Sequence, residues 1–426
     1  MSKILVLAAL CLPMATAQDP TSRPRSYGAI HADMMSAYRS SQWKPFLTHI
    51  NEGLALRPQY PPLVWNRAIG LAKLERLTEA IDLLKLLVKQ GIAYPPDADL
   101  VNLEKHPGFA AVKRGLAANK KPVGTPNVVA RGKSGSFVPE GIAYLPKARA
   151  HLLGSITQRS IVRIDASGKE TVLVAPGAGG LYSAFAFDPD EEGGFVDVAS
   201  SAVEQTVGIE HAARGRAGIF RYSLENGRLL SRHQLPSGRA HILGDLVRVG
   251  NSIFATDSIT GALWHLEREL GHFRQVVHPG RFLSLQGITT SEDGRLYVAD
   301  YRGGISLIDP KTGAVTAVTK PDDICLYGID GMRRSGRYLL CVQNGISPHR
   351  VIRLELDDKG QKILSARVLV ASHPEFDEPT QGVIAGDAFH FVANSHWNRF
   401  GPDGVLASGP WSPPLVLSIP FKPTTR

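Results

Sequence analysis

The chain has 426 residues, of which 43% are hydrophobic and 20% charged, a composition that is typical of a globular protein and excludes a disordered chain. The formal net charge is +9, but no run of five like charges occurs, so a diffuse basic surface is favoured over nucleic-acid binding. The 42 glycines and 29 prolines indicate many turns and a β-rich body, whereas three cysteines exclude a disulfide scaffold.

Residues 1–17 have the pattern of a secretory signal peptide. Lys3 supplies the basic start, residues 4–12 form a short apolar core, and Ala15–Ala17 has the small-x-small form of a cleavage site. The apolar core is too short to span a bilayer, and no later run of 18 apolar residues occurs. The sequence therefore predicts an exported protein, periplasmic or secreted, with no membrane span.

Two cysteines, Cys325 and Cys341, would remain after removal of the signal peptide. In an oxidising compartment they could pair, because both could lie at the same end of adjacent strands. The alternative is that both are buried free thiols.

Residues 27–120 are predicted to be helical, because their apolar residues recur with a period near 3.6. The segment 63–91 resembles a tetratricopeptide repeat, with small residues at Ala68, Gly70 and Ala80 that let two helices approach closely. At most two such units are present, fewer than a solenoid usually needs to fold alone, so we expect this domain to pack on the rest of the chain. It could bind a protein partner in a concave groove, or it could act only as a structural cap.

Residues 126–426 contain a repeated strand pattern. Five times an alternating strand runs into a polar turn that holds a glycine, and two further strands precede each copy. The first strand of each unit opens with a polar residue, and these six openers are Glu140, Ser183, Asp245, Gln286, Asp330 and Gln381. Repeats of roughly 40–60 residues with four strands each indicate propeller blades.

The pattern therefore predicts a mainly β fold: a six-bladed β-propeller of four-stranded antiparallel blades, preceded by the small α-helical domain. The sixth unit has only three strands before the chain ends. We expect residues 127–131 to supply its missing outer strand, because pairing the two ends of the propeller removes exposed edges.

The six openers are predicted to converge on one point, because the first strand of every blade lines the central channel. Three of them, Glu140, Asp245 and Asp330, are acidic, and three carboxylates at one mouth would repel one another unless a cation neutralised them. Oxygen ligands suit a hard divalent cation such as calcium or magnesium. The alternative is a polar, water-filled channel without a metal.

The stretch Pro139-Glu140-Gly141-Ile142 resembles the opening acidic motif of the SMP-30/gluconolactonase/LRE family, and residues 154–165 resemble the next two strands of that family's first blade. The resemblance covers about residues 126–420. It implies a six-bladed propeller with one catalytic divalent cation, usually calcium, that hydrolyses lactones or esters. It also implies Glu140, Gln286 and Asp330 as metal ligands, although Gln286 stands where the family has asparagine.

In this interpretation the cation would polarise the substrate carbonyl, and Asp330 or a histidine would take a proton from the attacking water. His241 and His396 are the two candidate histidines, and Ser183, Asp245 and Gln381 would line the channel. No G-x-S-x-G motif supports serine chemistry. The sequence thus predicts an exported metal-dependent hydrolase of lactones or related esters. The alternative is a non-catalytic propeller that binds a small ligand or a protein partner, with the helical domain as a second interaction surface.

Overall fold

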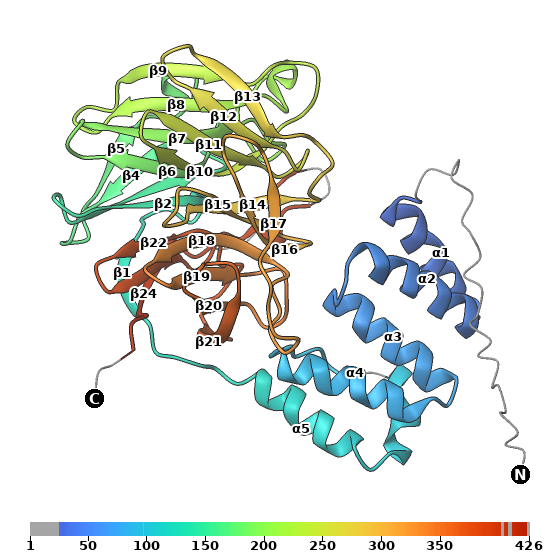
Figure 1. Ribbon diagram of the computed structural model, residues 1–426. Coiled ribbons are helices and arrows are strands. Elements are labelled where there is room, and N and C mark those ends of the chain that lie inside the picture. The colour runs from blue at the N-terminus through green and yellow to red at the C-terminus, as the bar shows by residue number, and fades with distance from the viewer. Residues whose placement is uncertain (1–24, 97, 402–403, 408–410, 424–426) are drawn as a thin grey trace, which may run out of the picture.

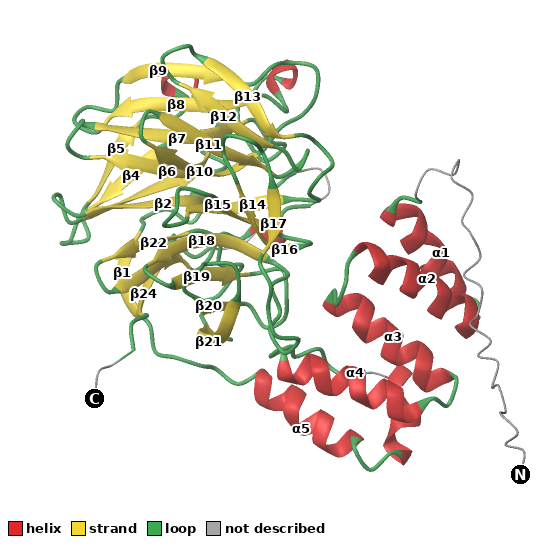
Figure 2. Cartoon of the chain, in the orientation of Figure 1, coloured by secondary structure: helices red, strands yellow, loops and turns green. Residues whose placement is uncertain are grey.

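The computed structural model describes residues 25–96, 98–401, 404–407 and 411–423, so the predicted signal peptide lies outside the described residues. The α-helices lie apart from the strands, as Figure 2 shows, and only short 3₁₀ helices lie among the strands. The N-terminal domain contains α1 (Tyr27–Arg39), α2 (Trp43–Leu56), α3 (Pro61–Lys73), α4 (Leu77–Lys89), the 3₁₀ helix η1 (Ala98–Lys105) and α5 (Phe109–Asn119). The propeller contains the 3₁₀ helices η2 (Ala178–Gly180), η3 (His211–Ala213) and η4 (Trp397–Arg399). No helix in these ranges has both the length and the apolar composition needed to cross a membrane.

The strands form six four-stranded antiparallel sheets, which are the blades of a propeller (Figure 1). Blade one is β2 (Pro139–Leu145), β3 (Ala150–Ser155), β4 (Ile161–Ile164) and β5 (Glu170–Val174), and blade two is β6 (Ser183–Asp190), β7 (Phe195–Ser201), β8 (Ala217–Ser223) and β9 (Leu229–Gln234). Blade three is β10 (Leu243–Val249), β11 (Ser252–Asp257), β12 (Leu263–Glu267) and β13 (His272–Val277), and blade four is β14 (Leu285–Thr290), β15 (Leu296–Asp300), β16 (Gly304–Ile308) and β17 (Val315–Ala317). Blade five is β18 (Ile329–Ser335), β19 (Tyr338–Gln343), β20 (Arg350–Leu356) and β21 (Ile363–Ala371), and blade six is β22 (Gly382–Ala385), β23 (Ala388–Val392), β24 (Leu415–Pro420) and β1 (Asn127–Arg131). The predicted fold class is confirmed.

The ring closes as the sequence predicts. The first strand of the propeller, β1, pairs antiparallel with the last, β24, from Asn127 opposite Ser418 to Arg131 opposite Leu415. Blade six is therefore built from both ends of the propeller segment, and β24 is paired on both sides, with β1 and with β23, so that it is not left as a free edge.

The helices pack in chain order, α1 on α2, α2 on α3 and α3 on α4. The small residues noted in the sequence lie at these crossings: Ala68 and Ala80 are fully buried. At Gly70 a Cβ atom would come within 2.7 Å of the Leu47 side chain. Any larger residue there would require the Leu47 side chain to shift.

The helical domain shares a hydrophobic core with blade five, as expected for a domain too short to stand alone. Cys325, Tyr327 and Ile346 of the propeller belong to the same buried cluster as the helical core. The Tyr327 hydroxyl donates to the Pro58 carbonyl over 2.5 Å, and the Arg350 guanidinium donates to the Gln90 carbonyl over 2.9 Å. These contacts fix the helices beside the channel mouth.

The two cysteines are free and buried, so the disulfide considered from the sequence is not formed. Cys325 lies in the loop before β18 and faces the helices, whereas Cys341 lies in β19 inside the core of blades four and five. Burial raises the pKa of both thiols, which makes them unreactive as nucleophiles.

A histidine pair joins blades one and six. The Nε2 atom of His151 on β3 lies 2.8 Å from Nδ1 of His390 on β23, and the Tyr144 ring packs against both imidazoles. Burial lowers the pKa of each histidine to about 4. Both rings are therefore neutral in the folded protein at neutral pH.

We expect this pair to make stability fall as the pH drops from about 6.5 to about 4, because the unfolded chain binds protons in that window before the folded chain does. The free energy of unfolding of the unmodified chain should be lower at about pH 5 than at about pH 7. Replacing both residues (His151→Gln with His390→Gln) should make this difference smaller by roughly 1–3 kcal/mol. Urea titrations followed by tryptophan fluorescence at both pH values measure this. His272→Gln, on the exposed face of β13, is the control, and an unchanged pH dependence in the double variant would contradict the prediction.

Candidate functional site

Three of the six opening residues lie inside β-bulges, and a further register shift lies directly before Asp245 in β10. Register shifts occur between Pro139 and Ile142 in β2, between Leu285 and Ile288 in β14, and between Ile329 and Met332 in β18. The residues inside these bulges are Glu140-Gly141, Gln286-Gly287 and Asp330-Gly331. A bulge turns a side chain out of the regular alternation of its strand. Here it turns each polar side chain toward the mouth of the channel.

The glycine that follows each of these three openers allows the next blade to approach. A Cβ at Gly287 would lie 2.7 Å from the backbone nitrogen of Met332, and a Cβ at Gly331 would lie 2.8 Å from the Thr380 carbonyl oxygen. Because both neighbours are backbone atoms, they cannot move aside as a side chain could. The repeated pattern of a polar residue and a glycine therefore has a steric cause.

The bulges bring the three predicted metal ligands into one cavity of about 260 Å³, which we call the mouth pocket. Glu140, Gln286 and Asp330 line it together. Its other lining residues, which the sequence did not single out, are Phe185, Ile242, Ser258, Tyr301, Asn344, Glu378 and Trp397. Three carboxyl groups thus face the pocket, and none of its lining residues is basic.

Each predicted ligand is held by a hydrogen bond from an unpredicted neighbour. The Trp397 indole donates to Glu140 Oε2 over 2.6 Å, and the Asn344 amide donates to Asp330 Oδ2 over 2.7 Å. Ser258 donates to Gln286 Oε1 over 3.1 Å. These bonds fix the orientation of the oxygen atoms that face the pocket.

The carboxyl groups of the mouth pocket are strongly perturbed. Burial and then the nearby charge of Asp330 raise the pKa of Glu140 well above its usual range. Burial also raises the pKa of Asp330, and the charge of Glu378 adds to this effect while the bond from Asn344 opposes it. Ionising both groups is therefore costly unless a cation lies beside them.

The donor set fits a hard divalent cation. Carboxylate and amide oxygens are the ligands that calcium and magnesium prefer, and Gln286 Oε1 and Asn344 Oδ1 each keep a second lone pair beyond the bond they accept. Across the residues that the structure describes, no group of three or more His, Cys, Asp and Glu side chains is placed to hold a metal. A cation here would therefore take two carboxylates, from Glu140 and Asp330, together with amide oxygens.

Asp245 is held in a different way. Its carboxylate is fully buried and accepts two bonds from the Arg333 guanidinium, at 2.6 and 3.1 Å. It also accepts the backbone N–H groups of Leu246 and Ile288. Asp245 is thus neutralised by an arginine and does not line the mouth pocket; Glu378 is the third acidic residue there.

Ser183 and Gln381 are buried in the body of the propeller and do not line the mouth pocket. The Ser183 hydroxyl donates to the Ile156 carbonyl over 2.5 Å and lies 2.7 Å from the Thr206 hydroxyl. The Gln381 amide donates to the Gly244 carbonyl over 3.5 Å, and its Oε1 atom is buried without a partner. Ser183 thus links blade two to the residue after β3 of blade one, and Gln381 links the start of blade six to β10 of blade three.

The two candidate histidines also lie outside the mouth pocket. His241 is buried, and its Nδ1 atom lies 2.6 Å from Asp257 Oδ2 at the edge of a separate cavity. His396 is buried between Asp377 and the Ser412 carbonyl, which engage its two ring nitrogens at 2.7 and 3.1 Å. His396 comes directly before Trp397 and the short helix η4 (Trp397–Arg399). His396 therefore positions the loop that carries Trp397, the hydrogen-bond donor to Glu140.

A sequence signal for the missed residues exists. Ser258, Tyr301 and Asn344 are the residues that directly follow the second strands β11, β15 and β19 of three successive blades. The loops after second strands lie at the same end of the propeller as the openings of the first strands, because successive strands are antiparallel. A polar residue at this position in several blades indicates a second ring around the openers.

No protein-family model and no curated protein sequence matches the chain. Its similar solved structures include a gluconolactonase from Xanthomonas campestris, with 14% identity, coverage of 71% of this chain and 93% of that chain, and a TM-score of 0.45. They include the calcium-binding protein regucalcin from Agrobacterium tumefaciens, with 14% identity, coverage of 69% and 96%, and a TM-score of 0.45. A luciferin-regenerating enzyme has 12% identity, coverage of 70% and 96%, and a TM-score of 0.47. The chain is thus similar to gluconolactonase-like propellers, and its own six four-stranded blades establish the fold.

Proposed function

We propose that this protein is an exported hydrolase of lactones or related esters that uses a divalent cation, calcium or magnesium, in the mouth pocket. One observation carries the proposal. Glu140 and Asp330, two buried carboxyls from different blades, meet in a pocket that no basic side chain lines. Asp245, the other acidic opener, has an arginine partner. The contrast favours a cation as the missing counter-charge of the mouth pocket.

Glu140, Asp330 and the amide oxygens of Gln286 and Asn344 are the groups that would hold the cation. When bound, it supplies a Lewis acid that stabilises negative charge on the substrate carbonyl oxygen. The indole of Trp397 and the amide of Asn344 each occupy one oxygen of their carboxyl partner. In this proposal the second oxygen of each carboxyl would contact the cation.

We assign Asp330 as the general base. In the proposed reaction a water oxygen attacks the carbonyl carbon while the Asp330 carboxylate accepts the proton of that water. When the carbon–oxygen bond of the ring or ester breaks, the departing alkoxide takes the same proton back. The products are a carboxylic acid and a hydroxyl group, which in a lactone belong to one molecule.

The hydroxyl of Tyr301 acts as a positioning group. It donates to Asn344 Oδ1 over 2.9 Å, and the Asn344 amide in turn donates to Asp330. This chain fixes which way the Asn344 amide faces, and hence which oxygen of Asp330 is occupied.

Metal binding tests the proposal most directly. We expect protein dialysed against calcium to retain one equivalent per chain, and its melting temperature to rise with added calcium, since a ligand at about 100 times its Kd stabilises by about 2.7 kcal/mol. Glu140→Gln should abolish both effects, although glutamine can still accept the bond from Trp397. Metal analysis and thermal melts measure this.

Glu292→Gln, at an exposed turn between β14 and β15, is the matched control and should behave like the unmodified chain. A protein that retains no metal and whose melting temperature ignores calcium and magnesium would contradict the hydrolase proposal. That result would favour the alternative, a non-catalytic propeller that binds a small ligand or a protein partner.

A further inference from the structure

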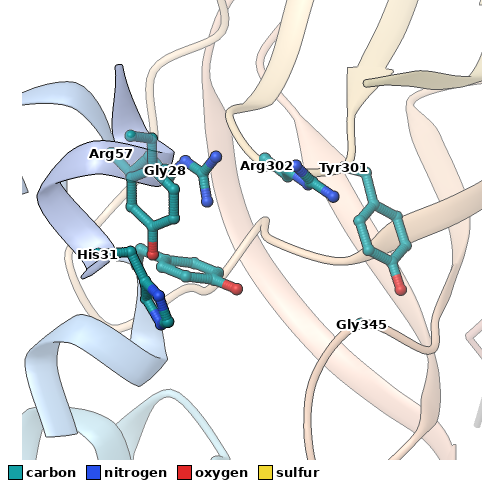
Figure 3. Close-up of a pocket in the computed structure, with 8 residues that line it drawn as sticks. Gly28, His31, Arg57, Tyr301, Arg302 and Gly345 are labelled. Carbon is teal, nitrogen blue, oxygen red and sulfur yellow. The ribbon is translucent and has the colours of Figure 1, made fainter. Parts of the chain in front are cut away.

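A second cavity, of about 410 Å³, lies where the helical domain meets the channel mouth. We call it the junction cavity. Tyr27 and His31 of α1 and Arg57 after α2 line its helical side, and Tyr301 and Arg302 after β15 line its propeller side (Figure 3). Tyr301 also lines the mouth pocket. The two cavities therefore adjoin at Tyr301.

The junction cavity is lined by basic side chains, whereas the mouth pocket is lined by acidic ones. The junction cavity carries two arginines and a histidine, and none of its lining residues is acidic. In the ranges that the structure describes, no salt bridge is formed by either Arg57 or Arg302. Figure 3 shows both guanidinium groups facing the space between the helices and the propeller loops.

Arg57 is the most unusual of these residues because it is only 5% exposed. Its guanidinium lies 3.3 Å from the centre of the Tyr27 ring, and its Nε atom is buried without a hydrogen-bond partner. Burial lowers the pKa of Arg57, the Tyr27 hydroxyl opposes this, and the charge of Arg302 lowers it further. A buried guanidinium without a counter-ion is costly, and an anion in the cavity would offset that cost.

We propose that the junction cavity binds an oxyanion group, a carboxylate or a phosphate, of the molecule whose lactone or ester group lies in the mouth pocket. The planar fork of arginine matches both groups by paired, charge-assisted hydrogen bonds. The volume exceeds that of a small oxyanion, and the tyrosine rings offer apolar walls for the adjoining part of the ligand. The substrates would then be acid-bearing lactones or esters; this second statement rests on the proposed function.

The first test measures anion binding without catalysis. Inorganic phosphate and glutarate are titrated by calorimetry into the full chain in the presence of a chelator, with neutral glutaramide as the comparison. We expect at least one of the two anions to bind, and glutaramide to bind at least ten times more weakly. Binding of phosphate alone identifies a phosphate group, and binding of glutarate alone identifies a carboxylate. Absence of binding by both anions overturns the proposal.

Variants locate the binding. Arg302→Gln removes an exposed side chain of the cavity and should weaken anion binding about 10- to 100-fold, as expected for the loss of charge-assisted hydrogen bonds. Arg281→Gln removes an exposed arginine of the loop between β13 and β14 and should leave it unchanged. Equal losses in both variants would show a general charge effect and would overturn the assignment to the junction cavity.

A third variant avoids any dependence on the buried Arg57. Gly28 lines the cavity, and a Cβ there would meet nothing closer than the Ser26 hydroxyl oxygen at 4.0 Å. Gly28→Glu should therefore fold and place a carboxylate beside the arginines, which competes with the anion. Gly28→Gln has the same size without the charge and should retain most of the binding. Similar affinities for the two variants would contradict the proposal.

The kinetic arm separates this inference from the proposed function. If the protein hydrolyses lactones, Arg302→Gln should raise KM about tenfold or more for an acid-bearing lactone and leave it unchanged for the neutral methyl ester of the same compound. If Glu140→Gln and the unmodified chain bind anions equally, while the unmodified chain hydrolyses no lactone, the junction cavity stands and the hydrolase proposal fails. Equal KM changes for both compounds would overturn the substrate assignment.

Discussion

Replacing Arg333 by methionine is expected to lower the free energy of unfolding by about 3–5 kcal/mol, because it leaves a buried carboxylate without its counter-charge. Asp245 is fully buried and lies 2.6 and 3.1 Å from the two terminal nitrogens of Arg333. The two residues stand on the inner strands of blades three and five, and the Ile288 amide of blade four also donates to Asp245. The pair thus joins three blades across the channel. Urea unfolding followed by circular dichroism measures the loss.

The neighbouring Arg334→Met is a matched control. Arg334 pairs with Glu292, whose side chain is 90% exposed, so its removal should cost less than about 1 kcal/mol. Adding Asp245→Asn to Arg333→Met should recover part of the loss, because the uncompensated charge is then removed. Equal stabilities for the Arg333 and Arg334 variants would show that the buried pair is not a major determinant of stability.

Asp330→Asn should lower kcat about 10²- to 10⁴-fold, the range expected when a general base is removed. Asparagine has nearly the same shape but cannot accept the proton of the attacking water. The assay is a panel of sugar and acyl lactones followed by acid release in a pH-stat, using any compound that the unmodified protein hydrolyses. The melting temperature should not fall, because a buried carboxyl that is costly to ionise is replaced by a neutral group.

Asp358→Asn, in the exposed turn between β20 and β21, removes the same charge from the same blade outside the mouth pocket and should retain full activity. Hydrolysis at the normal rate by Asp330→Asn would rule out its role as the base. Loss of activity with calcium still bound would support its role as the base, whereas loss of calcium binding as well would attribute the lost activity to its role as a ligand.

Much of the candidate site could be predicted because the propeller repeats. Glu140, Gln286 and Asp330 occupy the same position in three blades, so the period of the sequence alone aligns them around one axis. The structure adds that each stands in a bulge before a glycine. The repeat pattern did not show that Asp245, unlike Glu140 and Asp330, is paired with an arginine and does not line the mouth pocket. Its arginine partner is 88 residues away and occupies an inner-strand position without any distinguishing pattern.

The sequence by itself determined the architecture of this protein: helices before a propeller, six blades, and a ring closed by strands from both ends of the propeller segment. Alternation within strands and the spacing between repeats are local properties, and they suffice to define such a fold. Only the tertiary structure decided which charges are paired and which face a cavity. It placed Trp397, Asn344 and Tyr301 around the openers, and it placed Arg57 beside Arg302. These contacts join residues from different blades and from different domains, and they depend on how loops and helices pack against one another, which no periodicity in the sequence encodes.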